Sequence, residues 1–297
     1  MKKRKFEVYL LALYLIILGI YLAVPDGKTR LIFCDVGQGD GAIIIRGNWQ
    51  MLVDTGADNG KMLKCLDRYL PFWDKKIEGV MISHWDKDHC GALGSIIKNY
   101  KIENLFESVP SDNDIEKGIN TYKLKAGEMI KYGEMNWEIL SPGDDAGSSN
   151  ENSLVAVLDY KNKKFMFTGD ADMEAEGKMM TWWNGRVDGL KVAHHGADTS
   201  SSLEWLELIR PAIAVISVGK TNSYGHPKQV TLDNLKAIGA QILRTDQRGD
   251  IVLSGDDNMY NMPWILRQLK VSGKNFGKSI QSYIEQTMKV IKKKNIF

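Results

Sequence analysis

Short apolar, β-branched runs that end in polar residues or glycine constrain the fold of this chain more than any other feature. Runs of this length and composition are typical of buried strands. The expected strands form two groups, at residues 31–36, 41–47, 50–56 and 80–84, and then at 136–142, 153–160, 163–170, 189–195, 212–219 and 240–246. Helical patterns occur between them, at residues 60–71, 92–100, 172–183, 202–210 and 229–239. This order predicts an α/β fold with two sheets between helix layers, an αββα sandwich.

The composition allows one large domain with appendages. A chain of 297 residues with 43% hydrophobic content can bury a full core. The formal net charge of +2 is unevenly distributed: residues 1–25 carry +3 and residues 261–297 carry +7, which leaves −8 on residues 26–260. We therefore expect an acidic domain over 26–260 between two basic ends.

Three cysteines, Cys34, Cys65 and Cys90, show no paired spacing and no CxxC motif. Because the count is odd, at least one thiol is unpaired within a monomer, and we expect no disulfide framework. A chain with a large core does not need such cross-links, so this expectation says little about the compartment.

Residues 1–25 predict a membrane anchor. The basic cluster KKRK precedes residues 8–24, a stretch of seventeen residues without a charge. At about 1.5 Å per residue, this stretch is at the short limit for a helix that crosses a bilayer. A cleavable signal peptide is the alternative, but the stretch ends in YLAVPDG, without a small-x-small cleavage site. The positive-inside rule predicts a single-pass protein of the cell membrane with its body extracytoplasmic, or a secreted protein if the segment is cleaved.

The C-terminal segment, residues 261–297, has a different composition from the body. Its apolar residues fall at helical spacing on an otherwise basic segment; they are Ile280, Ile284, Met288 and Ile291. This pattern predicts a basic amphipathic tail. Packing on the body, contact with a membrane surface and contact with a phosphate backbone all remain open.

All five histidines occur in polar, glycine-flanked segments at the ends of apolar runs. The segment HWDKDH holds four candidate metal ligands, which are His84, Asp86, Asp88 and His89. Because alternate side chains of a strand point the same way, we expect His84, Asp86 and Asp88 to converge before the chain turns. A set of imidazole and carboxylate groups without cysteine suits zinc or manganese.

Asp170 ends the apolar run FMFTGD, next to a glycine that permits a tight exit from the strand. A carboxylate in this place can bridge two ions about 3.5–4 Å apart, as in two-metal hydrolases. The alternative is that Asp170 caps the helix that follows. Beside the segment HWDKDH we expect the bridge, and hence two divalent ions, zinc or manganese.

Several ordered motifs carry a family resemblance. HWDKDH resembles the HxHxDH signature of the metallo-β-lactamase superfamily, with Asp86 in place of the middle histidine. Together with DVGQGD, VDTG, NENSLV, FTGD, LKVAHHG and YGHP, it resembles the extracytoplasmic hydrolase domain of the ComEC family of DNA-uptake proteins. The resemblance covers about residues 30–255 and implies the metallo-β-lactamase fold. One expected anchor stands in place of the many-helix channel of ComEC proteins, so it implies the hydrolase and not transport.

The resemblance implies a set of metal ligands: His84 and Asp86 for one ion, Asp88 and His89 for the other, Asp170 as the bridge, His226 completing the second site, and one of the pair His194 and His195. Many family members have a further histidine where this chain has Asn152 and Ser153. The first site is therefore expected to be weaker, or to recruit His194 or His195. Adjacent side chains of an extended strand do not easily face one ion. We therefore expect His194 to bind metal and His195 to contact the substrate.

Three further carboxylates, Asp35, Asp40 and Asp54, are expected to support the ligands through hydrogen bonds. For Asp35 and Asp40, turn chemistry at a strand end is the alternative. The expected catalytic residues are Asp88, which orients the nucleophile while binding metal, and His195, which donates a proton to the leaving oxygen.

The expected function is cleavage of a phosphodiester, with DNA near the cell surface as the substrate that the resemblance implies. The charge of −8 on the body counts against DNA, because nuclease surfaces are usually basic. The alternatives are a hydrolase of a small phosphodiester, such as a phosphocholine ester, and a surface binding module that has lost its chemistry.

Overall fold

The structure is a computed structural model, and it describes residues 9–15, 19, 27–109, 118–132, 134–142, 150 and 152–254. The predicted tail, 261–297, and most of the predicted anchor, 1–25, lie outside this described part. Residues 9–15 are helical. Within the described residues, no helix has the length and apolar character needed to span a membrane.

The first sheet combines antiparallel and parallel strands. Its strands, in spatial order, are β14 (Ile251–Ser254), β1 (Thr29–Phe33), β2 (Gly41–Arg46), β3 (Trp49–Thr55), β4 (Lys76–Met81), β5 (Lys101–Glu107) and β6 (Asn120–Lys123). From β14 to β3 the neighbours are antiparallel, and from β3 to β6 they are parallel.

The second sheet has the same mixed character. Its strands, in spatial order, are β13 (Gln241–Arg244), β12 (Ile213–Ile216), β11 (Gly189–Lys191), β10 (Lys163–Phe167), β9 (Val155–Tyr160), β8 (Met135–Ser141) and β7 (Met129–Tyr132). Neighbours from β13 to β10 are parallel, and those from β10 to β7 are antiparallel.

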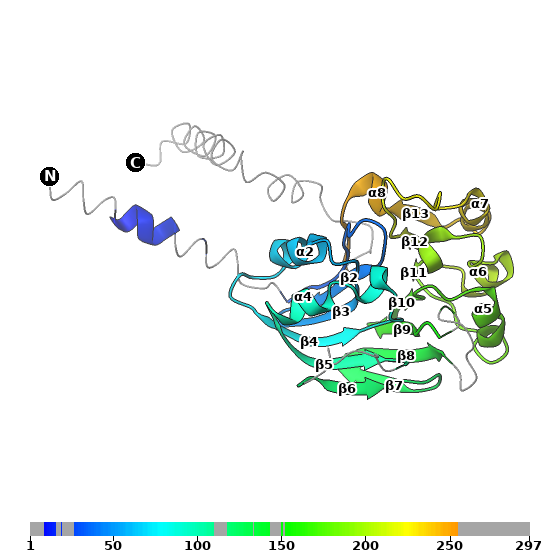
Figure 1. Cartoon of the computed structure of the whole chain (residues 1–297), viewed down its shortest axis with the longest axis horizontal. Coiled ribbons are helices and arrows are strands. Elements are labelled where there is room, and N and C mark those ends of the chain that lie inside the picture. Colours follow the sequence, from blue (N-terminus) through cyan, green and yellow to red (C-terminus); the bar gives the residue numbers. More distant parts are fainter. Residues whose placement is uncertain are drawn as a thin grey trace, which may run out of the picture. The chain divides into compact units, whose positions relative to one another are not determined.

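Helices cover the outer face of each sheet (Figure 1). On the first sheet lie α2 (Lys61–Tyr69) and α4 (Leu93–Ile97), and on the second lie α5 (Met173–Met180), α6 (Leu203–Ile209) and α7 (Gln229–Ala237). The short helices α3 (Lys87–Cys90) and α8 (Thr245–Arg248) and the 3₁₀ turn η2 (Ala193–Gly196) belong to loops. The predicted αββα sandwich is confirmed.

Strand β2 shows why the sequence forms this sandwich. Ala42 and Ile44 are buried in the core between the two sheets, whereas Ile43 and Ile45 are buried under α2 and α4. Since side chains alternate between the two faces of a strand, a continuous apolar run needs a cover on both faces. The second sheet and the outer helices provide these covers.

Strands β5, β6 and β7 were missed by the sequence analysis. Every residue of β6 is exposed, and no residue of β7 is fully buried. These two strands lie at the edges of their sheets, so they lack the apolar run by which the other strands are recognised.

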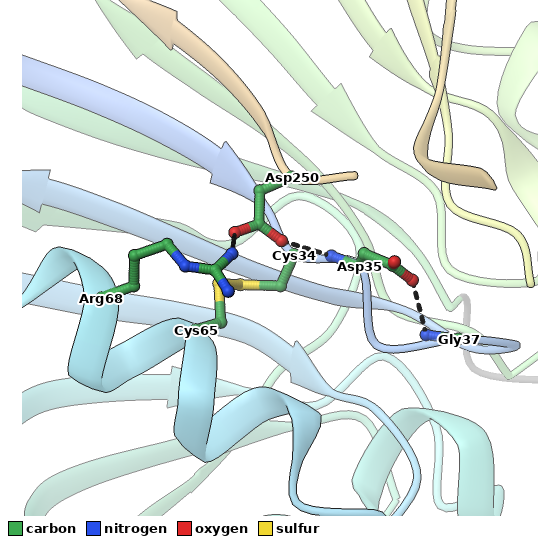
Figure 2. The surroundings of a disulfide bond; sticks show 6 residues. All are labelled: Cys34, Asp35, Gly37, Cys65, Arg68 and Asp250. Atoms are coloured by element: carbon green, nitrogen blue, oxygen red, sulfur yellow. Dashed lines mark hydrogen bonds and ion pairs between the residues drawn. A yellow bond between two sulfur atoms is a disulfide. The ribbon is translucent and has the colours of Figure 1, made fainter. Parts of the chain in front are cut away.

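The expectation of no disulfide is wrong, because Cys34 and Cys65 form one (Figure 2). Cys34 follows β1 and Cys65 lies on α2, so the bond joins the first sheet to its covering helix. The two cysteines are 31 residues apart and meet only when the helix packs on the sheet, which spacing alone does not reveal. Cys90 is a free thiol.

Candidate metal centre

The predicted ligands come from loops at one end of the two sheets. His84 follows β4, Asp170 follows β10, and the adjacent His194 and His195 follow β11. Because β10 and β11 are parallel, with Phe167 paired to Lys191, the residues after them leave the sheet at the same edge. His226 lies in the loop between β12 and α7.

Asp88 and His89 reach the site from a helix and not from a strand. β4 ends at Met81, and α3 begins at Lys87, directly after Asp86. The expectation that His84, Asp86 and Asp88 alternate along a strand is therefore wrong. Convergence comes from the turn of α3, which directs Asp88 and His89 toward Asp170 and His195.

Asp170 lies at the centre of the cluster. Its Oδ1 is 3.2 Å from Nε2 of His89, and its Oδ2 is 3.7 Å from Nε2 of His194 and 3.8 Å from Nε2 of His195. The preceding residue, Gly169, has a φ of +49°, and a Cβ there would come within 2.7 Å of Cβ of Ser83. Glycine is required at this position because it lets the strand end approach the loop after β4.

His195 is the buried member of the adjacent pair. Its Nε2 is 3.3 Å from Oδ2 of Asp88, and its Nδ1 is 3.1 Å from Oδ1 of Asp40 and 3.0 Å from the carbonyl oxygen of Ser217. His194 and His195 both have left-handed backbone conformations, with φ of 49° and 54°. The premise of an extended strand therefore fails here, and the two rings diverge with an interplanar angle of 73°.

Nε2 of His194 and Nε2 of His195 lie at similar distances from Oδ2 of Asp170, and the prediction that His194 is the ligand of this pair stays a prediction. Among the described residues, the groups of ligand atoms that lie within 4.8 Å of one another are His84 with His89 and Asp170, Asp88 with His89 and His195, Asp40 with Asp54 and His89, and Asp40 with Asp170 and His195. Of the predicted ligands, Asp86, His194 and His226 are outside these groups. The His194 side chain is 28% exposed, and its ring lies 5.8 Å from that of His226.

Two carboxylates contact the Nδ1 atoms of the buried histidines. Asp54 accepts hydrogen bonds from the backbone N–H and the hydroxyl of Ser83, and its Oδ2 is 2.9 Å from Nδ1 of His89. Asp40 has the same relation to Nδ1 of His195. Such partners fix the ring orientation of a ligand histidine, so that Nε2 faces the ion.

Lys191 is part of this arrangement, and its role was not predicted from the sequence. Its Nζ lies 2.6 Å from Oδ2 of Asp40, and both side chains are buried. A lysine inside the motif LKVAHHG at the end of an apolar run gives no signal that its side chain turns inward. Only the packing of the two sheets brings it to its partner Asp40, which lies in the loop between β1 and β2 of the first sheet.

Asp35 lies outside the cluster. Its carboxylate accepts a hydrogen bond from the backbone N–H of Gly37 (Figure 2). The same carboxylate lies 3.4 Å from Nζ of Lys61. Its own backbone N–H donates to Asp250, which also pairs with Arg68. Asp35 thus stabilises the turn after β1. This is the role at a strand end that was given above as the alternative for Asp35.

The buried polar atoms of the cluster fit divalent metal ions. Within the described residues, several inward-facing ligand atoms are buried and make no hydrogen bond: Nε2 of His84, His89 and His195, and Oδ1 of Asp170. Buried polar atoms without hydrogen bonds are costly, and divalent ions held between the histidines and the carboxylates would satisfy these four atoms. Imidazole and carboxylate donors without sulfur suit zinc, manganese or iron.

The carboxylates and histidines of the cluster shift one another's pKa. Burial lowers the pKa of His89, but Asp170 and Asp54 outweigh burial and raise it well above its usual value. Burial also lowers the pKa of His195, but Asp40 and Asp170 outweigh burial and raise this pKa to about 9. Burial lowers the pKa of His84. A metal ion binds the deprotonated imidazole, so these shifts couple metal uptake to proton release.

Comparison with known proteins identifies the class. No family model matches the chain. Its structure resembles that of the metallo-β-lactamase fold protein YhfI from Bacillus subtilis with a TM-score of 0.54, covering 77% of this chain and 100% of that one at 12% identity. The chain therefore has the metallo-β-lactamase fold, as predicted; at this level of identity the likeness shows the fold alone.

The sequence comparison is more specific. The chain is 31% identical over 257 residues to ComE operon protein 3 of Bacillus subtilis, which is 76% of this chain and 33% of that protein. It is 26% identical over 232 residues to Competence protein ComA of Neisseria gonorrhoeae, 76% of this chain and 32% of that protein. The predicted resemblance to the competence proteins is confirmed. The chain spans about a third of the length of these curated relatives.

Proposed function

We propose that this chain is a metal-dependent hydrolase that cleaves phosphodiester bonds with two divalent ions, zinc or manganese, held around Asp170. The observation that carries the proposal is the placement of the Asp170 carboxylate, with one oxygen toward His89 and the other toward His194 and His195. A carboxylate with ligands on both sides is suited to bridging two ions.

The ligands divide into two groups around the bridge. His84 and Asp86 serve one ion, with Oδ2 of Asp86 3.5 Å from Nε2 of His84. A second group, Asp88, His89 and His195, serves the other ion. We assign His195 as a ligand, in place of His194, because its Nε2 faces Asp88 and its Nδ1 is held by Asp40.

Two divalent ions, when bound, lower the pKa of a water toward about 7 and neutralise the charge that develops on the phosphoryl oxygens. Around them, Asp88 orients the attacking water, because its Oδ2 faces the cluster beside His195. His194 and His226 border the exposed side of the cluster, and we assign His194 to donate the proton to the leaving oxygen.

DNA is the proposed substrate. The name of one relative is Competence protein ComA, and the sequence resemblance covers most of the described body. The basic segment 261–297, with a charge of +7, supplies the phosphate contacts that the acidic body lacks. A small phosphodiester is the second candidate, because the charge of −8 on residues 26–260 disfavours a long polyanion.

The proposed location is the cell membrane, with a single-pass anchor and an extracytoplasmic body. The uncharged stretch 8–24 after KKRK supports the anchor. The disulfide between Cys34 and Cys65 supports a body outside the cytoplasm, because disulfides form and persist in oxidising compartments.

The test compares two substrates with the full chain loaded with zinc or manganese. Single-stranded DNA and bis-p-nitrophenyl phosphate should both be cleaved, and Asp170→Asn should abolish both activities. Deleting residues 285–297 should reduce the salt dependence of DNA binding while leaving the small diester unaffected, since each lost phosphate contact lowers the slope by about 0.7–0.9. Cleavage of the small diester alone would favour the second candidate. Absence of both activities in a metal-loaded protein would indicate a binding module.

A further inference from the structure

The two ends of the described body leave the first sheet side by side. In the pairing of β1 with β14, Arg30 lies opposite Ser254 and Phe33 lies opposite Ile251. Strand β1 therefore begins at the same end of the sheet at which β14 stops. The uncharged stretch 8–24 precedes this point in the sequence, and the basic segment 261–297 follows it.

This end of the sheet is opposite to the metal centre. Thr29, the first residue of β1, pairs with Arg46 at the end of β2, whereas Phe33 pairs with Ala42 beside Asp40 of the cluster. Strand β4 runs parallel to β3 and carries His84 beyond its far end. The length of these strands, at about 3.3 Å per residue, separates the two ends by roughly 17 Å.

An exposed aromatic pair marks the same end. Phe72 and Trp73, in the loop from α2 into β4, are 81% and 47% exposed, and their rings are in edge contact at 4.8 Å. The loop leads into Lys76, the first residue of β4, and the backbone N–H of Lys101 at the start of β5 donates to Lys75. Large aromatic side chains in water are unfavourable, whereas Trp is enriched where a membrane meets water.

Chain length limits how far this end can lie from a bilayer. The five steps from Val24, the end of the uncharged stretch, to Thr29 span at most about 18 Å when fully extended. From β1 to β4 the sheet advances by three strand spacings, about 14 Å, so the start of β4 lies within the same range. Ser254, the last described residue of β14, lies at this end too, so the chain enters and leaves the described body at the end that exposes Phe72 and Trp73.

We propose that the end of the fold opposite the metal centre rests on an anionic lipid bilayer, with Phe72 and Trp73 inserted among the headgroups. The inference rests on the proposed membrane anchor and adds an orientation to it. The metal centre then faces away from the membrane, open to a substrate that arrives from outside the cell.

Tryptophan quenching tests the orientation in the full chain, reconstituted in vesicles of phosphatidylcholine and phosphatidylglycerol that carry brominated acyl chains. Trp73→Phe should lose the lipid-dependent quenching that the wild type shows. Adding Val230→Trp to that variant restores the total number of tryptophans. The new tryptophan lies on helix α7, on the side of the fold that carries the metal centre, where Val230 is 50% exposed. This matched control should not recover the quenching. The other seven tryptophans are common to all variants, so the signal of residue 73 is the difference in quenching between the wild type and Trp73→Phe.

Equal quenching in the wild type and Trp73→Phe would overturn the orientation, as would recovery in the Val230→Trp control. Failure of the full chain to float with vesicles would overturn both the anchor and the orientation. None of these measurements depends on metal loading or hydrolysis. A chain that shows the expected quenching and cleaves no phosphodiester would refute the proposed activity and leave the orientation standing.

Discussion

The ammonium of Lys191 lies 2.6 Å from Oδ2 of Asp40, and the other oxygen of Asp40 lies 3.1 Å from Nδ1 of His195. All three side chains are buried. Burial raises the pKa of Asp40, but Lys191 and His195 outweigh it and lower the pKa to about 2, so Asp40 is ionised. The buried lysine thus stabilises the charge of the carboxylate that orients His195.

Removing Lys191 should strongly destabilise the fold. Lys191→Met removes the lysine partner of the buried Asp40 carboxylate, and breaking a buried pair in this way typically costs about 3–5 kcal/mol. Urea unfolding at neutral pH measures the loss. The double variant Lys191→Met/Asp40→Asn should recover part of it, because the unpaired charge is gone. A single variant as stable as the wild type would show that the pair does not stabilise the fold.

The adjacent histidines should respond differently to substitution. His195→Ala should lose one bound ion, because its Nε2 faces Asp88. His194→Ala should keep both ions and lose about 10²–10⁴-fold in turnover, the range of a general acid. Metal content and the rate with bis-p-nitrophenyl phosphate distinguish the two roles. Loss of an ion from His194→Ala alone would reverse the assignment.

The disulfide should add stability to the body. A cross-link across 31 residues stabilises the folded state by about 3–4 kcal/mol, because it lowers the conformational entropy of the unfolded chain. Cys34→Ser/Cys65→Ser should lower the free energy of unfolding by this amount, and a reductant should have the same effect on the wild type. Cys90→Ser is the control. Three reactive thiols in the denatured, non-reduced protein would refute the bond.

Glu176 should make stability depend on pH. It is buried on α5 and accepts hydrogen bonds from the backbone N–H groups of Ser201 and Ser202. Burial raises its pKa from 4.5 to about 7. A raised carboxyl pKa contributes stability below pH 4.5 that is lost as the pH rises through 7, roughly 3 kcal/mol. Unfolding of the wild type and Glu176→Gln between pH 5 and 8 measures the difference, and identical profiles would contradict it.

The layers of the fold could be predicted because their strands bury both faces. Residues 42–45 of β2 point alternately into two cores, so this stretch is apolar. Strands β6 and β7 could not be predicted, because at the sheet edges their side chains are mostly exposed. The Cys34–Cys65 bond depends on the packing of α2, which is tertiary information.

The site was predicted in its residue types and less well in its geometry. His84, Asp88, His89 and Asp170 meet, as the motifs indicated. The choice between His194 and His195 assumed an extended backbone, whereas both histidines adopt left-handed conformations. Lys191 was missed because its partner, Asp40, lies in a loop of the other half of the fold, between β1 and β2.

Metal content per chain tests the central claim most directly. The full-length protein, measured by elemental analysis after zinc or manganese loading and dialysis, should hold two ions. Asp170→Asn should hold at most one, because the bridge between the two groups is lost. Asp198→Asn, an exposed carboxylate near the pair of histidines, is the matched control and should hold two. Two ions in Asp170→Asn, or none in the wild type, would contradict the account.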